Sequence, residues 1–338
     1  MRLSYLSSRC PACSFKLIRW GKTTKGRQRY RCSNCGKSKL RKSPGLLSRK
    51  KMFVLFREYV LYGATYDRLS YRSGFSIQYL SLWFHKFLEE PTPPIPKFDQ
   101  LQEDAFLLAD GLWFGRYFVL MVYRQSKNLL ILKISTAKRE VSTKIAKDFK
   151  ILLSLGYHFT GIISDDGTGL VKAVKEIFPH VPHQVCLAHM HRRVVANIGK
   201  KPTDERVEKL RGLADWVWKI ESLEALRWWK KELIRWEHEN FDYLREYRVD
   251  QTGHWWYIHK GPRKALNTLI EAAEVSFTFL THPTMPKTTN EIEAQFGHLE
   301  NRWQEHQGLK RNRWEHFLTW FVHFYNEKKL AESKKKKA

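Results

Sequence analysis

The sequence predicts a mixed α/β core that follows a small cysteine-rich module and a three-helix segment. Two CxxC pairs lie close to the N-terminus and indicate a metal-bound ribbon within residues 1–45. Helical patterns separated by glycine follow over residues 46–90. Between about residues 106 and 195, short apolar runs alternate with helical stretches, which is typical of an α/β fold.

The composition is strongly basic, with 60 Lys and Arg against 34 Asp and Glu in 338 residues and a formal net charge of +26. A field of this sign attracts polyanions, and double-stranded DNA is the partner that we expect. The longest apolar runs, such as Tyr117–Tyr123, are too short to span a membrane, and the N-terminus has no apolar signal core. We therefore expect no membrane association and a cytoplasmic, nucleoid-associated protein whose thiols stay reduced.

The four N-terminal cysteines have the spacing of a structural zinc site. Each CxxC lets both thiolates reach one ion, and two such pairs separated by eighteen residues complete a tetrahedral Zn²⁺ site. The basic stretch between the pairs suits a hairpin that presents cations to a phosphate backbone, with protein contact as the alternative. The expected zinc ligands are Cys10, Cys13, Cys32 and Cys35, and the expected DNA contacts are Arg27, Arg29 and Arg31.

The three-helix pattern of residues 46–90 predicts a helix-turn-helix domain. Apolar residues recur at helical spacing through Lys50–Tyr62, Thr65 can cap a second helix, and Gly74 allows a turn before a third. Helix-turn-helix domains have this arrangement, and their last helix enters the major groove. A helical bundle that only spaces two domains is the alternative. Base contacts are expected from the start of the third helix, at Ser76, Gln78 and Tyr79.

Three acidic positions could form a second metal centre. Asp110 ends the apolar run LLAD and Asp165 follows the run GIIS, so each carboxylate lies at the end of an expected strand. Strand ends in α/β sheets commonly line a binding crevice, and a buried carboxylate requires a partner or a metal. Glu291 or Glu293, at the start of a later helix, could add a third oxygen ligand. Such a set suits Mg²⁺ or Mn²⁺, although an Asp after an apolar run is also common as a turn or helix cap.

Taken in order, these motifs resemble the Mutator-like DDE transposases of bacterial insertion sequences over roughly residues 105–325. The N-terminal ribbon also resembles the zinc ribbon of several insertion-sequence transposases. The residues that match are Asp110 in LLADG, Asp165 followed by Gly169-Leu170, the CxxH of Cys186 and His189 that begins 21 residues after Asp165, and the TN-x-IE motif that ends at Glu293.

The resemblance implies a ribonuclease-H-like catalytic core. In it, Asp110, Asp165 and Glu293 would hold two Mg²⁺ or Mn²⁺ ions for phosphoryl transfer. Glu293 is preferred to Glu291 because of its place in the TN-x-IE motif. Asp166 departs from the family, which usually has glycine directly after the second aspartate.

Residues of one helix after the second aspartate are implied to serve the same site. His189 would contact the scissile phosphate or position the other groups, and a buried structural pair with Cys186 is the alternative. Arg192 and Arg193 follow on the same helix and could clamp phosphate.

The 128 residues from Asp165 to Glu293 exceed what one helix crossover needs, so a helical insertion is implied. Its many tryptophans fit a helical core with large side chains. Some could instead stack on bases flipped from a cleaved end, and Trp255 and Trp256 are the better candidates because their context is polar and loop-like.

The expected organisation is a zinc ribbon (1–45), a helix-turn-helix (46–90), a linker (91–100), the first part of the core (101–198), the helical insertion (199–285), C-terminal core helices (286–328) and a basic tail (329–338). Within the tail, the charge run Lys334–Lys337 is expected to be solvated and disordered. The expected function is that of a transposase that binds the terminal repeats of its element, cleaves them and joins them to target DNA, as a homodimer on DNA. The alternatives are a transposase-derived DNA-binding protein without catalysis and a related metal-dependent nuclease.

Overall fold

A computed structural model describes residues 10, 12–24, 26, 28–40, 49–91, 105–127, 129–290, 292–293, 296–297, 299, 309 and 311–337. Arg27, Glu291 and the expected linker beyond Pro91 lie outside these residues. The chain divides into two compact units, Met1–Phe87 and Leu88–Ala338. No helix in the described part of the chain is long and apolar enough to cross a membrane.

The cysteine-rich segment is an antiparallel sheet of three strands in the order β1-β2-β3. The predicted hairpin between the cysteine pairs is confirmed, because β1 and β2 pair antiparallel with Leu17 opposite Cys32. A tight turn follows the second pair, where Gly36 adopts the left-handed φ of 68° that glycine tolerates best. The strands are β1 (Leu17–Lys22), β2 (Gln28–Cys32) and β3 (Ser38–Leu40).

Three helices follow, with the caps and turns that the sequence predicted. The Thr65 hydroxyl accepts a hydrogen bond from the Arg68 N–H at 3.3 Å and begins the second helix. Gly74 ends it at φ 74°, and the Ser76 hydroxyl accepts from the Tyr79 N–H at 3.2 Å to begin the third. The helices are α1 (Arg49–Tyr62), α2 (Tyr66–Ser73) and α3 (Ile77–Glu89).

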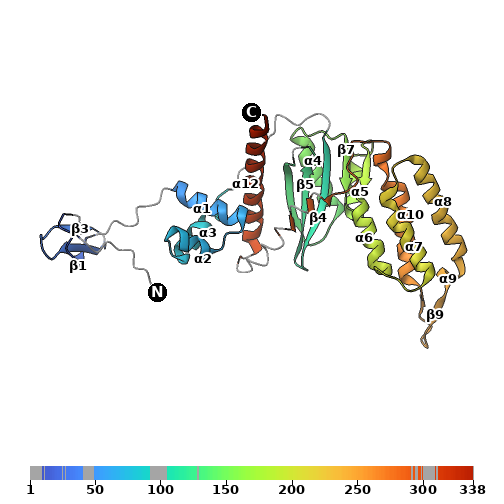
Figure 1. Cartoon of the computed structure of the whole chain (residues 1–338), viewed down its shortest axis with the longest axis horizontal. Helices are drawn as coiled ribbons and strands as arrows, with labels where there is room; N and C mark the ends of the chain where they lie inside the picture. Colours follow the sequence, from blue (N-terminus) through green and yellow to red (C-terminus); the bar gives the residue numbers. More distant parts are fainter. Residues whose placement is uncertain are drawn as a thin grey trace. The chain divides into compact units, whose positions relative to one another are not determined.

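The second unit is built on a mixed sheet of five strands in the order β6-β5-β4-β7-β8 (Figure 1). The first three strands of this order pair antiparallel, whereas β7 and β8 pair parallel with β4 and with each other. The predicted α/β core is therefore confirmed. The strands are β4 (Phe106–Phe114), β5 (Phe118–Gln125), β6 (Ile131–Ala137), β7 (Gly161–Ser164) and β8 (His183–Val185).

The helices α4 (Ser142–Ser154) and α5 (Thr168–Ile177) pack on one face of the sheet. Leu107 and Ala109 of β4 belong to this buried core together with Phe149 of α4. Because side chains alternate along a strand, Asp110 points to the opposite face. The strand pattern thus places an acidic group away from the helices that fill the core.

The predicted helical insertion consists of helices that extend from the edge of the sheet beside β8 (Figure 1). Trp229 and Trp236 are buried there, and their indole N–H groups donate to backbone carbonyls at 2.8 and 2.9 Å, as expected for a core of large side chains. Helix α6 (Leu187–Ile198) still belongs to the expected core segment 101–198. The elements of the expected insertion are α7 (Glu205–Trp216), η1 (Val217–Lys219), α8 (Leu223–Glu239), α9 (Phe241–Arg245), α10 (Lys260–Val275) and η2 (Thr278–Leu280).

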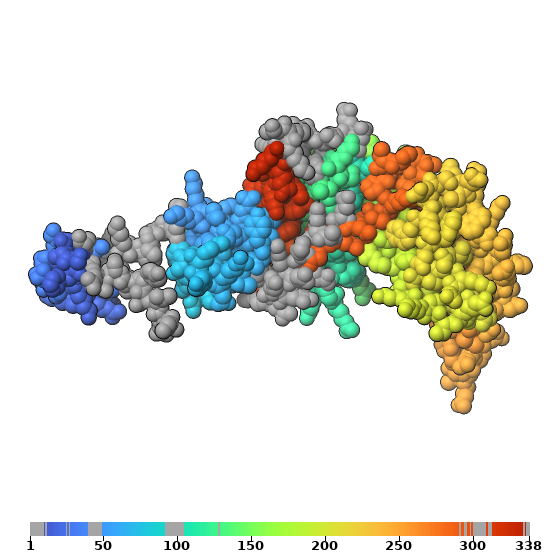
Figure 2. Space-filling view, in the orientation of Figure 1, coloured from blue at the N-terminus to red at the C-terminus, as the bar shows by residue number. Residues whose placement is uncertain are grey.

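A short hairpin projects from these helices, and its exposed side chains stand clear of the helical surface in Figure 2. Its strands β9 (Tyr247–Val249) and β10 (Trp255–Tyr257) pair antiparallel. Trp255 is 55% exposed at its start. The hairpin therefore presents aromatic surface that no described part of the chain covers.

The C-terminal helix α12 (Arg311–Lys337) lies along the edge strand β6. The buried Asn326 side chain donates to the Ile131 carbonyl at 2.9 Å and accepts from the Ile131 N–H at 3.0 Å, and so it pairs with the strand edge as a neighbouring strand would. The run Lys334–Lys337, expected to be disordered, instead continues this helix, since lysine is a good helix former.

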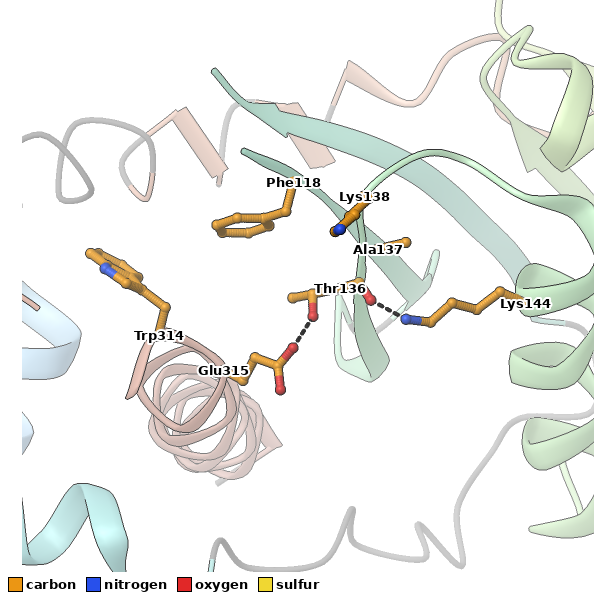
Figure 3. Close-up of a pocket in the computed structure, with 7 residues that line it drawn as sticks. All are labelled: Phe118, Thr136, Ala137, Lys138, Lys144, Trp314 and Glu315. Carbon is orange, nitrogen blue, oxygen red and sulfur yellow. Dashed lines mark hydrogen bonds between the residues drawn. The ribbon is translucent and has the colours of Figure 1, made fainter. Parts of the chain in front are cut away.

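A hollow of about 210 Å³ lies between the sheet and the start of α12 (Figure 3). Phe118 and Trp314 face it from the two sides, and the Thr136 hydroxyl donates to Glu315 across it. Lys144 donates to the Thr136 carbonyl. The first of these bonds joins α12 to the sheet, and the second joins α4 to it. None of the predicted site residues lines the hollow.

Candidate active site

The sheet brings the first two predicted acids together. In the parallel register of β4 and β7, Ala109 lies opposite Ser164, so Asp110 and Asp165 are the next residues along neighbouring strands. Such strands lie about 4.8 Å apart. The Asp165 N–H also donates to the Ala109 carbonyl at 3.3 Å, which extends the ladder to the second aspartate.

Asp110 is almost completely buried, with 1% of its surface exposed. Its Oδ1 accepts from the Gly111 N–H at 2.8 Å. The Thr289 hydroxyl is close enough to lower the pKa of this carboxyl, but the buried Oδ2 accepts no hydrogen bond of normal geometry from the described residues. Burial raises the pKa of Asp110 to about 7, with repulsion from Asp165 and Glu293 adding to the rise and His189 opposing it. A buried carboxylate oxygen without a hydrogen-bond partner is costly, and a bound cation would pair with it.

The third predicted acid reaches the same place from the far end of the chain. His189 Nε2 lies 3.3 Å from Glu293 Oε1 and 3.8 Å from Asp110 Oδ1. These three residues can each offer one ligand atom, and the three atoms all lie within 4.8 Å of one another. Arg192 donates to both Glu293 oxygens, at 3.0 Å to Oε2, and holds this carboxylate in place.

The Cys186 and His189 motif links the second aspartate to the third acid. Cys186 begins α6, and its buried Sγ accepts from the Thr289 N–H at 3.2 Å. Burial lowers the pKa of His189, but its hydrogen bond to Cys186 and the charges of Asp110 and Asp165 outweigh this and raise the pKa to about 9. The imidazole is therefore a cation among carboxylates at neutral pH.

These acids fit a divalent cation. Burial raises the pKa of Asp165 as well, with Asp166 adding to the rise and the Gly167 N–H and His189 opposing it. Asp165 directly follows β7, as expected, but Asp110 lies in the middle of β4, because this strand continues to Phe114 instead of ending at the aspartate. Carboxylate oxygens of this kind suit a hard cation. A cation there would relieve the carboxylate repulsion and supply the missing partner of Asp110 Oδ2.

Both arginines predicted to clamp phosphate are ion-paired within the chain. Arg192 pairs with Glu293, while Arg193 Nε lies 3.1 Å from Asp166 Oδ2 and its Nη2 lies 2.9 Å from Glu271 Oε2. Asp166, which departs from the family pattern, therefore has a partner of its own beside the site.

The sequence reasoning missed one acid, Glu140. It lies in the loop between β6 and α4, where no motif or periodicity singles it out. Its carboxylate approaches Gly111 and Gly167, the glycines that follow the two aspartates. Glycine at these two positions was the one signal in the sequence that could have indicated close packing there.

The four ribbon cysteines form a second cluster. Cys10 Sγ lies 3.5 Å from Cys35 Sγ, and Cys13 Sγ lies 3.4 Å from Cys32 Sγ. All four sulfurs lie within 4.8 Å of one another. Four thiolates at about 2.3 Å from one ion would have similar sulfur separations, so this set fits a tetrahedral soft-ligand metal site.

The remaining predicted contacts lie on the surface. Arg29 and Arg31 are exposed on the ribbon, and Arg31 stacks over Trp20 at 4.6 Å. Ser76 and Gln78 are exposed on the first turn of α3, with Tyr79 half-buried beside them.

Comparison with known sequences gives a family match. Residues 131–253 match the model of the Mutator family of transposases, a segment that contains Asp165, Cys186 and His189. A transposase for the insertion sequence element ISRM5 of Rhizobium meliloti (strain 1021) is 31% identical over 149 residues. That match covers 40% of this chain and 34% of the relative, so the chain spans about a third of the relative's length. The resemblance predicted from the motifs is confirmed for this segment.

Two solved structures are also similar. The strand transfer complex of the Drosophila P element transposase aligns with a TM-score of 0.35 and 15% identity, over 77% of this chain and 65% of that chain. The catalytic core domain of HTLV-2 integrase in complex with magnesium aligns with a TM-score of 0.21 and 15% identity, over 36% of this chain and 88% of that chain.

Proposed function

We propose that this protein is a Mutator-type DDE transposase that binds the ends of its element and performs metal-dependent DNA cleavage and strand transfer. The observation that carries the proposal is the convergence of Asp110 and Glu293 on His189, with Asp165 on the neighbouring strand. The Mutator-family match over residues 131–253 supports it independently.

In this proposal Asp110, Asp165 and Glu293 hold two Mg²⁺ or Mn²⁺ ions in a ribonuclease-H-like core. Bound there, such ions activate the attacking oxygen and stabilise the leaving one. Arg192 positions Glu293 through its paired hydrogen bonds. The raised pKa of His189 makes it a cation beside Glu293, suited to orient the carboxylate or to contact the scissile phosphate.

The other modules would supply DNA recognition. The ribbon, with one structural Zn²⁺ on its four cysteines, and the helix-turn-helix with Ser76 and Gln78 on its last helix would read the terminal repeats. The exposed hairpin with Trp255 and Trp256 would stack on bases at the cleaved end. Joining two ends requires two active sites, so we expect a homodimer on DNA.

The test uses a labelled duplex that carries the terminal sequence of the protein's own element, a target plasmid, and buffer with or without Mg²⁺. We expect the wild type to cut at the element end and to join the new 3′ end to the plasmid only with Mg²⁺. Asp110→Asn, Asp165→Asn and Glu293→Gln should each lower both steps on the order of a thousandfold or more, since such groups act as a unit. Glu176→Gln, an exposed acid on α5, is the matched control and should act as wild type.

Two other results would each contradict the proposal. Tight binding of the element end without cleavage by any variant would identify a DNA-binding protein derived from a transposase. Mg²⁺-dependent cleavage that never yields joined products would identify a nuclease.

A further inference from the structure

Glu140 occupies space that two glycines leave open beside the aspartates. A Cβ on Gly111 or on Gly167 would collide with the Glu140 carboxylate, one oxygen at each glycine. Gly169 makes room for the Glu140 backbone, whose carbonyl oxygen would lie 2.9 Å from a Cβ at that position. Three glycines of two separate segments thus surround one glutamate.

These glycines are not required by the backbone conformation. Gly167 has a φ of −59°, which any residue adopts, and neither Gly111 nor Gly169 has a positive φ. Glycine at Gly111 and Gly167 therefore serves to admit the carboxylate. A Cβ at Gly167 would lie 2.9 Å from Asp165 Oδ1 and closer still to Glu140 Oε2. The two carboxylate oxygens are therefore less than twice 2.9 Å apart.

Two acidic neighbours repel the Glu140 carboxylate. It forms no ion pair with Lys or Arg among the described residues, and its nearest charged neighbours include Asp165 and Asp166. Burial raises the pKa of Glu140 to about 7, repulsion by Asp165 adds to this, and Trp113 and His189 oppose it. The orphaned and buried Asp110 Oδ2 is an independent sign that this cluster is completed by a cation.

We propose that Glu140 supplies an additional carboxylate oxygen to the divalent-cation site at Asp165. This rests on the proposed metal centre, and it adds a ligand from the loop between β6 and α4 to the three acids assigned above. Metal ligation explains why a half-buried acid without a Lys or Arg partner reaches the two strands that bring Asp110 and Asp165 together. A further oxygen ligand would strengthen cation binding at a site where Arg192 already engages Glu293.

The test measures Mn²⁺ binding to the full chain by the electron paramagnetic resonance signal of free Mn²⁺, with no DNA present. We expect Glu140→Gln to weaken Mn²⁺ binding roughly tenfold or more, as loss of a supporting group at metal sites commonly does. The metal-free Glu140→Gln protein should melt about 2 °C or more above wild type, since a repulsive charge is gone, and should gain less from added Mn²⁺. Glu176→Gln, which makes the same change on the exposed face of α5, should match wild type in all three measurements.

A second variant keeps the test decisive if Glu140→Gln does not fold. Glu140→Asp keeps the charge but withdraws it by one methylene, and it should weaken Mn²⁺ binding while remaining folded. Suppose that wild type binds Mn²⁺ and that Asp165→Asn does not. If both Glu140 variants then bind Mn²⁺ as tightly as wild type, the proposed role of Glu140 is wrong and the metal centre stands. If wild type itself binds no more Mn²⁺ than Asp165→Asn, the metal centre and the role of Glu140 are both overturned.

Discussion

The Sγ of Cys186 accepts a hydrogen bond at 3.2 Å from the backbone N–H of Thr289, which lies 103 residues further along the chain. This bond joins the start of α6, three residues before His189, to the segment that carries Glu293. The helical insertion separates these two segments in sequence, so the thiol helps to return the third acid to the sheet.

Replacing Cys186 with alanine should destabilise the protein because the buried Thr289 N–H loses its acceptor. We expect a loss of about 1–3 kcal/mol in the free energy of unfolding, measured by urea denaturation of the full chain. Cys186→Ser keeps an acceptor at nearly the same place and should lose less. Equal stability of the alanine and serine variants would show that the hydrogen bond contributes nothing.

In the magnesium-free protein, the contribution of Asp110 and His189 to the free energy of unfolding should fall as the pH rises from about 4 to about 9. The folded chain raises the pKa of Asp110 to about 7 and that of His189 to about 9, so it binds more protons than the unfolded chain in this range. Protonation of these groups makes its full contribution to the free energy of unfolding below their pKa values in the unfolded chain. That contribution is lost as the pH rises through their pKa values in the folded chain.

Melting temperatures of the dialysed protein across this pH range would measure the effect. Asp110→Asn should reduce the decline between about pH 4 and 7, to which Glu140 and Asp165 also contribute, and His189→Gln should reduce the decline between about pH 7 and 9. Added Mg²⁺ competes with these protons, so its stabilising effect should grow with pH. A flat profile in wild type would contradict the assigned pKa shifts.

The sequence was sufficient where local chemistry decides the structure. Thr65, Gly74 and Ser76 begin and end helices because their caps need only neighbouring backbone atoms. Asp110 and Asp165 could be paired because both end apolar runs that become adjacent strands.

Features that depend on distant parts of the chain could not be predicted in the same way. Arg192 and Arg193 were expected to be available for phosphate, but each pairs with an acid that only the fold brings near. Glu140 lies in a loop without periodicity, and its surroundings come from two segments on either side of it in sequence. The continuation of α12 to Lys337 follows from a helix anchored by Asn326.

The exposed hairpin should contribute to DNA binding and little to stability. Trp255→Ala should change the free energy of unfolding by less than about 0.5 kcal/mol, because the side chain is 55% exposed. It should weaken binding of a single-stranded oligonucleotide by about 1–3 kcal/mol, roughly 5- to 150-fold, in fluorescence anisotropy. Trp228→Ala, which removes an indole that is 47% exposed on α8, is the control and should leave binding unchanged. Equal affinities of the two variants would exclude stacking by Trp255.

The close packing of Gly111 against Glu140 can be tested by a double-mutant cycle. Gly111→Ala places a methyl group against the Glu140 carboxylate and should cost about 1–3 kcal/mol of unfolding free energy. In a Glu140→Ala background the methyl group no longer meets the carboxylate, while Val119 Cγ2 remains at 3.3 Å, and the cost should fall by at least about 0.5 kcal/mol.

Gly212→Ala supplies the control for this cycle, because the added methyl group in α7 meets nothing within 4 Å. It should raise stability by about 0.4–1 kcal/mol in both backgrounds, since alanine is the better helix former. The same penalty for Gly111→Ala with and without the Glu140 side chain would show that the carboxylate does not lie against this glycine. In that case Gly111 would be constrained by Val119 alone, and the loop between β6 and α4 would hold Glu140 away from the aspartates.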